Sequence, residues 1–219
     1  MVDAEVVRAN LAEVTATVDE AAAGAGRAPG SVAILAAVKY VTREDLTALA
    51  DAGVKLVGEN RTDALIDKQE GFADAFRWDF IGHVQSRKAR DLVGRVELVH
   101  ALSAESTARQ IDVRAERPQD VLVEVNIAAD PGKEGVAPDE LDAFLEMLAG
   151  LENVRVRGLM TMPPFAEDPE ASRSTFRRLA ELGRSHGLAE LSMGTSQDWR
   201  VAVEEGATLI RVGSTLFRD

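Results

Sequence analysis

A lysine follows directly on a short apolar run in the first fifth of the chain. Lys39 comes after residues 32–38 (VAILAAV), a composition typical of a buried strand, so it should lie at the carboxyl end of that strand. Burial at such a place lowers the pKa of a lysine and frees its amine to form a Schiff base with a carbonyl compound. A solvated lysine at a strand end is the alternative, which position alone leaves open.

Two glycine-containing segments near the end of the chain have the composition of anion-binding loops. Residues 192–196 (SMGTS) and 211–215 (RVGST) each close an apolar run. Backbone N–H groups in such turns can bind a phosphate group, to which Ser196 and Ser214 would add hydroxyl groups and Gly213 a close approach of the backbone. For Ser196 an ordinary helix N-cap is the alternative.

Arg211 opens the second of these segments, two residues before Gly213. Alternation along a strand would point its side chain inward. A guanidinium only donates hydrogen bonds, so in that place it could face a ring nitrogen and keep it unprotonated. A salt bridge to a neighbouring carboxylate is the alternative.

These residues need a framework that brings distant strand ends together, and the rest of the sequence has the pattern of one. An amphipathic helix is predicted from Asp3 to about Gly24, and short apolar runs then alternate with helical segments. The eight predicted strands are 32–38, 55–58, 78–82, 96–100, 121–127, 155–160, 189–192 and 208–212. Helices are predicted from near Thr42, Arg61, Ser86, Ala104, Pro138, Pro169 and Gln197.

Repeated strand and helix units of this kind most economically close into a barrel. We therefore predict an α/β fold, a single (β/α)8 TIM-type barrel domain over residues 1–219 with an additional N-terminal helix. An open doubly wound sheet is the structural alternative. In a barrel the functional groups gather at the carboxyl ends of the strands, and the loops after strands seven and eight frequently bind phosphate together. Lys39 and the two glycine-containing segments occupy such positions.

Composition narrows the class of protein. The 219 residues carry a net charge of −12, which disfavours nucleic acid and anionic membranes as partners. The absence of cysteine excludes disulfides and thiolate chemistry, and His83, His100 and His186 lie too far apart for a local metal motif. No apolar run is long enough to span a bilayer, so we expect a cytoplasmic protein.

Further strings of residues extend the pattern over nearly the whole chain. They read AVK at 37–39, GEN at 58–60, FIGHVQS at 80–86 with Lys88, VNI at 125–127 with Lys133 and Gly135, GLMTMP at 158–163, SMGTS at 192–196 and RVGS at 211–214. In this order they resemble the pyridoxal 5′-phosphate (PLP) homeostasis proteins, also called the YggS or proline synthase co-transcribed family, which share the barrel of alanine racemase's N-terminal domain. The resemblance implies a fold type III PLP protein.

The resemblance also implies roles for individual residues. Lys39 would form the Schiff base with PLP, and Arg211 would face the pyridine nitrogen. Ser196, Gly213 and Ser214 would hold the phosphate group. Other residues that fall in family motifs lining the pocket are Asn60, His83, Met193 and Asn126. For His83 a core histidine bonded to backbone is the alternative.

Two departures from the family pattern lie near the end of the chain. Ser214 stands where the family commonly has threonine, a change that retains the hydroxyl group. Phe217 and Arg218 stand where the family usually has phenylalanine and glycine. The second departure follows the expected phosphate loop, which we expect to be unaffected.

Together these features favour a carrier or regulator of the intracellular PLP (vitamin B6) pool over a dedicated enzyme. Beside an arginine the ring nitrogen of PLP stays unprotonated, and the cofactor is then a weaker electron sink. Alanine racemase takes a catalytic tyrosine from a further domain, whereas Tyr40, the only tyrosine here, would point away from Lys39 in strand geometry. We expect PLP as cofactor, PLP-dependent apoenzymes as recipients, and a monomer.

Two other functions remain open from the sequence. One is an amino-acid racemase of relaxed specificity that uses Lys39 together with a pocket water or His83. The other is a PLP-free barrel enzyme that binds a sugar phosphate and forms a Schiff base between Lys39 and its substrate.

Overall fold

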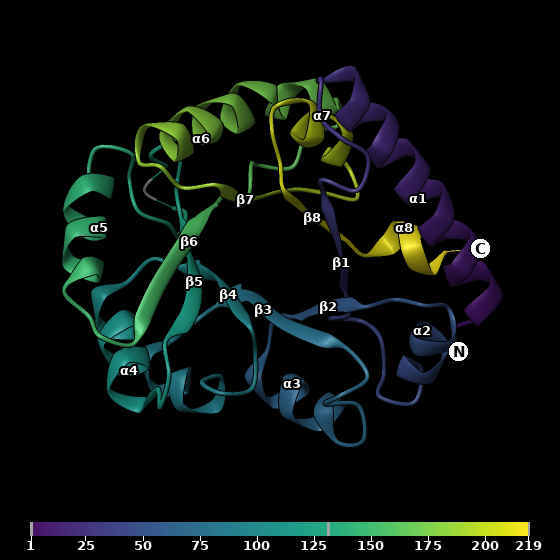
Figure 1. Ribbon diagram of the computed structural model, residues 1–219, viewed down its shortest axis with the longest axis horizontal. Helices are drawn as coiled ribbons and strands as arrows, with labels where there is room; N and C mark the ends of the chain where they lie inside the picture. The colour runs from purple at the N-terminus through teal and green to yellow at the C-terminus, as the bar shows by residue number, and fades with distance from the viewer. Residues whose placement is uncertain (1, 131, 219) are drawn as a thin grey trace.

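The computed structural model describes residues 2–130 and 132–218, in which parallel strands form a closed ring with helices around it (Figure 1). The strands are β1 Ala33–Ala37, β2 Leu56–Glu59, β3 Arg77–His83, β4 Leu98–Leu102, β5 Gln119–Glu124, β6 Val154–Met160, β7 Glu190–Thr195 and β8 Leu209–Val212. The α-helices are α1 Ala4–Gly24, α2 Leu46–Asp51, α3 Thr62–Gln69, α4 Glu105–Arg114, α5 Leu141–Ala149, α6 Arg173–Ser185, α7 Trp199–Glu204 and α8 Ser214–Phe217. Two 3-10 helices are η1 Ser86–Asp91 and η2 Pro169–Ser172.

Each strand pairs in parallel with the next one in sequence, and β8 pairs with β1 to close the barrel. The predicted barrel with an additional N-terminal helix is thus confirmed, and the open sheet is not found. Every predicted strand is present, although β5 begins at Gln119 and ends at Glu124, earlier than its prediction of 121–127. Gly53, Gly187 and Gly206 follow α2, α6 and α7 with positive φ angles of 89°, 67° and 108°, a conformation that favours glycine at the end of a helix.

Two of the helices that begin later than their sequence signals start after a hydrogen-bonded turn. α2 was predicted from near Thr42 but starts at Leu46, because Thr42 first forms a side-chain turn with Asp45, whose N–H lies 3.3 Å from the Thr42 hydroxyl. α5 likewise starts at Leu141, after a turn that begins at Ala137. The signals at these two sites therefore mark hydrogen-bonded turns that precede a helix, and not its first residue.

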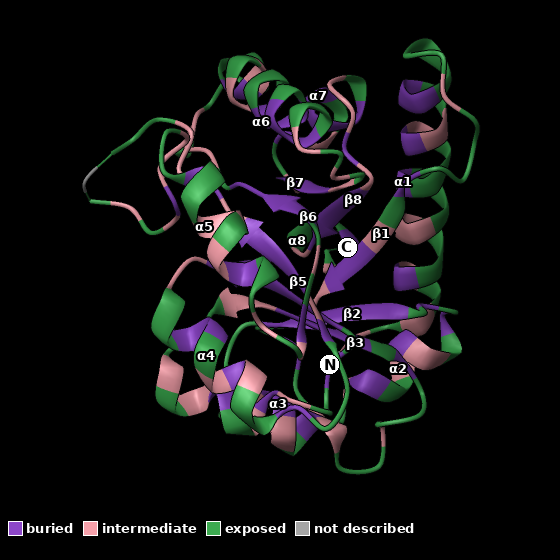
Figure 2. Ribbon diagram, turned by 60° about the vertical axis from the view of Figure 1, so that its left-hand side comes forward, coloured by how far each residue is buried: buried purple, intermediate pink, exposed green. Residues whose placement is uncertain are grey.

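The N-terminal helix α1 packs along the outside of the barrel, as the purple face turned towards the strands shows in Figure 2. Asp3 caps its start by accepting the N–H of Glu5 at 2.8 Å, and Val7, Val14 and Val18 form its buried face. Among the described residues no helix is long and apolar enough to cross a membrane.

Two layers of apolar side chains hold the barrel together. The larger layer lies between the strands and the helices and includes Phe80, Ile111 and Phe176. The smaller layer fills the barrel itself with the clusters Leu35, Leu56, Leu209 and Leu98, Ala101, Leu122, Met160. Because successive side chains of a strand point to opposite faces, residues two positions beyond these inner ones are placed to reach the barrel mouth at the carboxyl ends of the strands.

Candidate functional site

Lys39 lies in a turn immediately after β1, at the rim of the barrel mouth. The turn is closed by the N–H of Val41, which donates to the carbonyl of Val38 at 2.9 Å. Lys39 and Tyr40 form the exposed tip, with the lysine Nζ 4.8 Å from the centre of the tyrosine ring. The strand geometry under which Tyr40 would point away from Lys39 is not present, because the strand has already ended at Ala37. The lysine is exposed, so the structure around the turn, and not burial, must direct its amine.

The next two strand ends along the rim carry Asn60 and His83. Both residues are exposed, and His83 Nε2 lies 3.8 Å from a carboxylate oxygen of Glu134. β2 and β3 approach each other closely here. A Cβ atom at position 82 would lie only 2.2 Å from the carbonyl oxygen of Asn60, so Gly82 allows this approach because it has no side chain. His83 is therefore a rim residue, and the core alternative does not hold.

Arg211 points into the barrel from β8 and is 6% exposed, in agreement with the predicted alternation. Its guanidinium donates to the carbonyl of Ser192 at 2.9 Å, to the hydroxyl of Ser192 at 2.5 Å and to the carbonyl of Thr161 at 3.1 Å. Burial lowers the pKa of Arg211 to about 10, which still leaves the guanidinium charged at neutral pH. Within the described residues no carboxylate forms a salt bridge with it, so the salt-bridge alternative is not found.

A buried chain of polar groups continues from Arg211 to Asp79. Because the guanidinium can only donate, Ser192 Oγ accepts from it and turns its own hydrogen to Nδ1 of His100, 2.9 Å away. The hydrogen of His100 is then on Nε2, which donates to Asp79 at 3.1 Å. Burial lowers the pKa of His100 although Asp79 opposes the effect, which agrees with a neutral ring.

Sequence reasoning did not assign a role to Asp79, His100 or Ser192 in the site. The three residues come from β3, β4 and β7, so only the closed barrel brings them together. Alternation was the one available signal, since Asp79 is two residues before Ile81 and His100 two residues after Leu98, both of which face the interior.

Glu124 is a further residue that the sequence analysis did not single out. It ends β5, two residues after the interior Leu122, and is half-buried. Burial raises the pKa of its carboxyl group, against the opposing charges of His83 and Arg211. The mouth therefore contains a carboxyl group with a raised pKa on β5, the strand that lies across the barrel from β1.

The loops after β7 and β8 meet, as the prediction of a joint anion site requires. The N–H of Gly213 donates to the hydroxyl of Ser196 at 3.1 Å, and Ser214 follows as an exposed residue at the start of α8. The N-cap position of α7 is held by Asp198, so the alternative of Ser196 as a helix cap is not found. Ser196, Gly213 and Lys39 thus belong to the ends of three neighbouring strands, β7, β8 and β1.

Two residues of the predicted pocket are placed differently from the rest. Met193 is fully buried in the core layer between strands and helices, because its neighbour Ser192 takes the inward position on β7. Any contact of Met193 with a ligand is therefore made by its backbone. The amide of Asn126 bonds the loop that follows β5, donating to the carbonyl of Asp130 at 2.8 Å. Its side chain shapes that loop.

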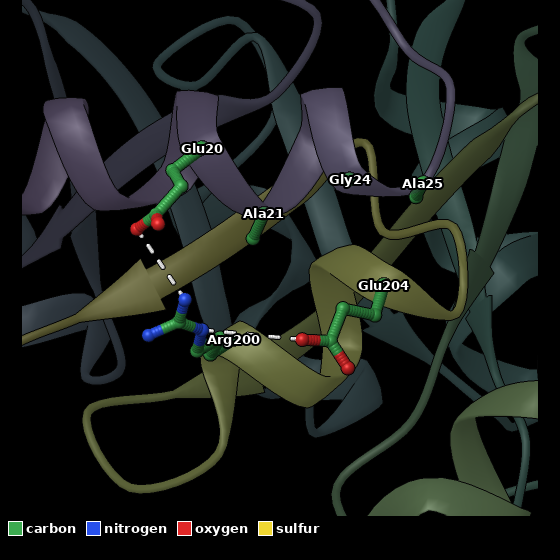
Figure 3. A pocket seen from close by; sticks show the side chains of 6 residues that line it. All are labelled: Glu20, Ala21, Gly24, Ala25, Arg200 and Glu204. Atoms are coloured by element: carbon green, nitrogen blue, oxygen red, sulfur yellow. Dashed lines mark hydrogen bonds and ion pairs between the residues drawn. The ribbon is translucent and has the colours of Figure 1, made fainter.

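A separate pocket lies outside the barrel between α1 and α7 (Figure 3). Its charged groups satisfy one another: Arg200 lies 3.3 Å from a carboxylate oxygen of Glu20 and 3.9 Å from one of Glu204. The pocket contains no lysine, and no group of three or more potential metal ligands occurs in the described part of the chain. The polar groups described above gather at the barrel mouth, which is the candidate site.

Comparisons with known proteins agree with the fold and with the resemblance. Residues 6–219 match the family model described as alanine racemase, N-terminal domain. The chain is 40% identical to the pyridoxal phosphate homeostasis protein of Aquifex aeolicus, covering 95% of this chain and 96% of that one. It is 30% identical to the protein of the same name from Escherichia coli strain K12, over 95% and 94% of the two chains.

Two solved structures superpose on the fold of this chain. PipY of Synechococcus elongatus with PLP bound superposes with a TM-score of 0.82 at 31% identity, covering 97% of this chain and all of that one, 100%. Alanine racemase of Corynebacterium glutamicum superposes with a TM-score of 0.73 at 16% identity, over 99% of this chain and 61% of that one. At that identity the second likeness shows the fold alone.

Proposed function

Because this chain belongs to the family of pyridoxal phosphate homeostasis proteins, within the alanine racemase N-terminal domain family, we propose that it binds PLP at the barrel mouth and acts in intracellular PLP homeostasis. In this proposal Lys39 holds the cofactor as a Schiff base. One observation carries it: the ends of β7, β8 and β1 present a hydroxyl group, a backbone N–H and an amine at one rim.

The residues of the mouth fit the three parts of PLP. An aldehyde needs an accessible primary amine, which Lys39 supplies from an exposed turn. A phosphate group needs hydrogen-bond donors, which Ser196 and Ser214 would supply with their hydroxyl groups and Gly213 with its N–H once that group leaves Ser196. A pyridine nitrogen would meet the guanidinium of Arg211, which donates and cannot accept. Asn60 and His83 would line the ring from the neighbouring rim.

The chemistry of Arg211 favours a carrier over an enzyme. When bound, PLP supplies an imine and an electron sink, and the sink is strong only if the ring nitrogen is protonated. Arg211 presents donors at this position, and its bonds to Ser192 and Thr161 fix it there. We therefore propose that the protein holds PLP and passes it to PLP-dependent apoenzymes.

The remaining parts of the proposal concern the whole protein. We propose that residues 1–219 form one PLP-binding domain that acts as a cytoplasmic monomer. We propose that neither nucleic acid nor a membrane is its partner. The acidic net charge of −12 supports the last point. Sedimentation velocity with and without PLP tests the oligomeric state.

An amino-acid racemase of relaxed specificity is the second candidate, because the mouth contains acid–base groups besides Lys39. Glu124 and His83 lie on β5 and β3, away from β1 around the ring. Chiral chromatography of amino acids incubated with the PLP-loaded protein separates the candidates, since a carrier leaves each enantiomer unchanged and a racemase mixes them.

The experiment that tests PLP binding is a visible absorption spectrum of the purified protein with added PLP. The proposal predicts a Schiff-base absorption band. Borohydride reduction should remove this band and leave the cofactor attached to the protein by a stable bond. A colourless protein after PLP addition would instead favour the PLP-free sugar-phosphate enzyme.

A further inference from the structure

Beneath the turn that carries Lys39 lies a buried ion pair for which the proposed function has no role. Glu59 ends β2 and is fully buried, and Lys68 of α3 is 5% exposed. The ammonium group of Lys68 contacts the carboxylate of Glu59 directly. Apolar residues can often replace a buried ion pair without loss of stability, so stability alone does not account for this one.

The bonds of Lys68 lead to the turn of Lys39. Its Nζ atom also donates to the carbonyl oxygen of Val38 at 2.7 Å. This is the same carbonyl that accepts the N–H of Val41 at 2.9 Å and so closes the turn. Val38 immediately precedes Lys39, so the buried ammonium group holds the point from which the side chain of Lys39 starts.

The bonds of Glu59 lead to the segment between β2 and α3 that carries Asn60. Its second carboxylate oxygen accepts the backbone N–H groups of Asn60 at 2.6 Å and Arg61 at 3.1 Å, where β2 passes into α3. Glu59 thereby fixes the neighbouring rim and holds Lys68 at the same time. The turn with Lys39 and the rim with Asn60 are joined through two buried side chains.

We propose that Lys68 and Glu59 are positioning residues that fix the turn of Lys39, so that its exposed amine meets the aldehyde of PLP in one geometry. An exposed lysine has many rotamers, and a fixed starting point reduces the range its amine explores. This inference rests on the proposed function, because it takes Lys39 as the residue that reacts with PLP.

The test replaces both charges at once, because removal of a single partner would leave a buried charge unpaired. In Glu59→Gln with Lys68→Met, the glutamine keeps an acceptor for the N–H groups of Asn60 and Arg61, while the bond to Val38 is lost. Two ligands are compared: PLP, followed by its Schiff-base absorbance, and pyridoxine 5′-phosphate, which has the same ring and phosphate group but no aldehyde, followed by calorimetry.

We expect Schiff-base formation with PLP to slow by about tenfold or more in the double variant, while the affinity for pyridoxine 5′-phosphate stays within about twofold. Unchanged Schiff-base formation, or an equal loss for both ligands, would overturn the inference. If wild-type protein forms no Schiff base, the proposed function itself fails, which is a distinct outcome. Should the double variant not fold, Glu59→Gln with Lys68→Gln takes its place with the same expectations, because the shorter glutamine falls short of Val38.

Thr107→Val is the matched control. The hydroxyl of Thr107 is another buried donor to a carbonyl just after a strand, that of Val84, at 3.0 Å. It does not touch the turn of Lys39. Its loss is expected to leave Schiff-base formation at the wild-type rate, and a slowing as large as in the double variant would show that any lost bond beneath the rim suffices, against the inference.

Discussion

Lys39 follows β1, and Arg211 lies on the adjacent strand β8, where it pairs with Leu35 of β1, yet the surroundings of the two cations differ in almost every respect. Lys39 stands exposed in a turn with one aromatic ring beside its amine. Arg211 is buried, donates to three oxygen atoms and is continued by the polar chain through Ser192 to His100. One cation is exposed and the other is enclosed.

The difference matches what the two groups must do in the proposed function. A lysine that forms and releases an imine has to be accessible to the aldehyde that enters and leaves, so exposure helps. A group that sets the protonation of a ring nitrogen has to keep one position, and fixed hydrogen bonds provide it. In the proposed function the exposed Lys39 therefore reacts with the cofactor, and the buried Arg211 contacts its ring nitrogen.

Lys39→Ala is the change with the largest expected effect on function. It should abolish the Schiff-base band with PLP completely, because no other amine lies in the turn after β1. The free energy of unfolding should stay within about 0.5 kcal/mol, because the side chain is exposed. Absorbance titration and urea unfolding measure the two effects. Lys133→Ala is the control and should keep the band; if instead the band persists in the first variant and is lost in the second, the assignment of Lys39 is wrong.

Arg211→Met should show the opposite pattern, with a large loss of stability. Methionine fills part of the volume but leaves the buried oxygens of Ser192 and Thr161 without their donor, at a cost of about 3 kcal/mol. Urea unfolding measures this loss. Any Schiff-base band that remains should also be shifted, since the ring nitrogen has lost its donor.

Arg27→Met is the control for that experiment. Arg27 also donates to backbone carbonyls, that of Val203 in α7 at 3.2 Å and that of Ala207 just after α7 at 2.8 Å, but it follows α1 before β1 begins. It should lower stability without any shift of the band. A shift of equal size in both variants would contradict the role of Arg211.

The polar chain that supports Arg211 predicts a pH dependence of stability. Burial lowers the pKa of His100 in the folded protein, so on acidification the unfolded chain takes up the proton first. The free energy of unfolding should therefore fall as pH drops below about 6.5, by at most about 1.4 kcal/mol per pH unit for this group, until the lower native pKa is passed. His100→Gln should flatten the dependence in urea unfolding between pH 7 and 5.

His186 makes an opposite and smaller contribution to the same profile. Its pKa is raised, first by a bond to the carbonyl of Leu182 and then by Asp142, so its stabilisation is present at low pH and is lost as pH rises through the native pKa. Its partner Asp142 is exposed, and screening by solvent weakens the effect. His186→Gln should make the free energy of unfolding fall slightly more steeply on acidification.

For His100→Gln, a free energy of unfolding that depends on pH as in the wild type would contradict the neutral, buried state of His100.

Ser196→Ala should have a smaller effect on PLP binding than Lys39→Ala. It removes the hydroxyl group that accepts the N–H of Gly213 and is proposed to bind phosphate, so we expect the affinity for PLP to fall by about tenfold with the Schiff-base band retained. Calorimetry with PLP measures the change. Ser185→Ala, which removes a bond to a helix carbonyl of Leu182, is the control and should bind as wild type.

The sequence predicted the barrel because periodicity is local, whereas the interior of the mouth depends on partners far apart in the chain. Lys39 and Arg211 could be placed at strand ends from the apolar runs before them. The bond from His100 to Ser192 spans 92 residues, and no local pattern indicates it. The same is true of Lys68, which reads as a helix-surface lysine until α3 packs its side chain under β1.

Tyr40 and Met193 are placed differently from what the sequence suggests, each for its own reason. Tyr40 was expected on the face away from Lys39, but the turn at Val38 brings its ring beside the lysine. Met193 was expected at the pocket from a motif alone, yet alternation on β7 buries its side chain in the outer core. Motif membership predicts that a segment is near a site, and the backbone decides which atoms reach it.

The central claim is that Lys39 is the residue that binds PLP covalently. Its most direct test is peptide mapping by mass spectrometry of wild-type protein that has been mixed with PLP and reduced with borohydride. We predict one pyridoxyl-phosphate adduct, on the peptide that contains Lys39. An adduct on Lys88 or Lys133 in its place, or no adduct at all, would contradict the account.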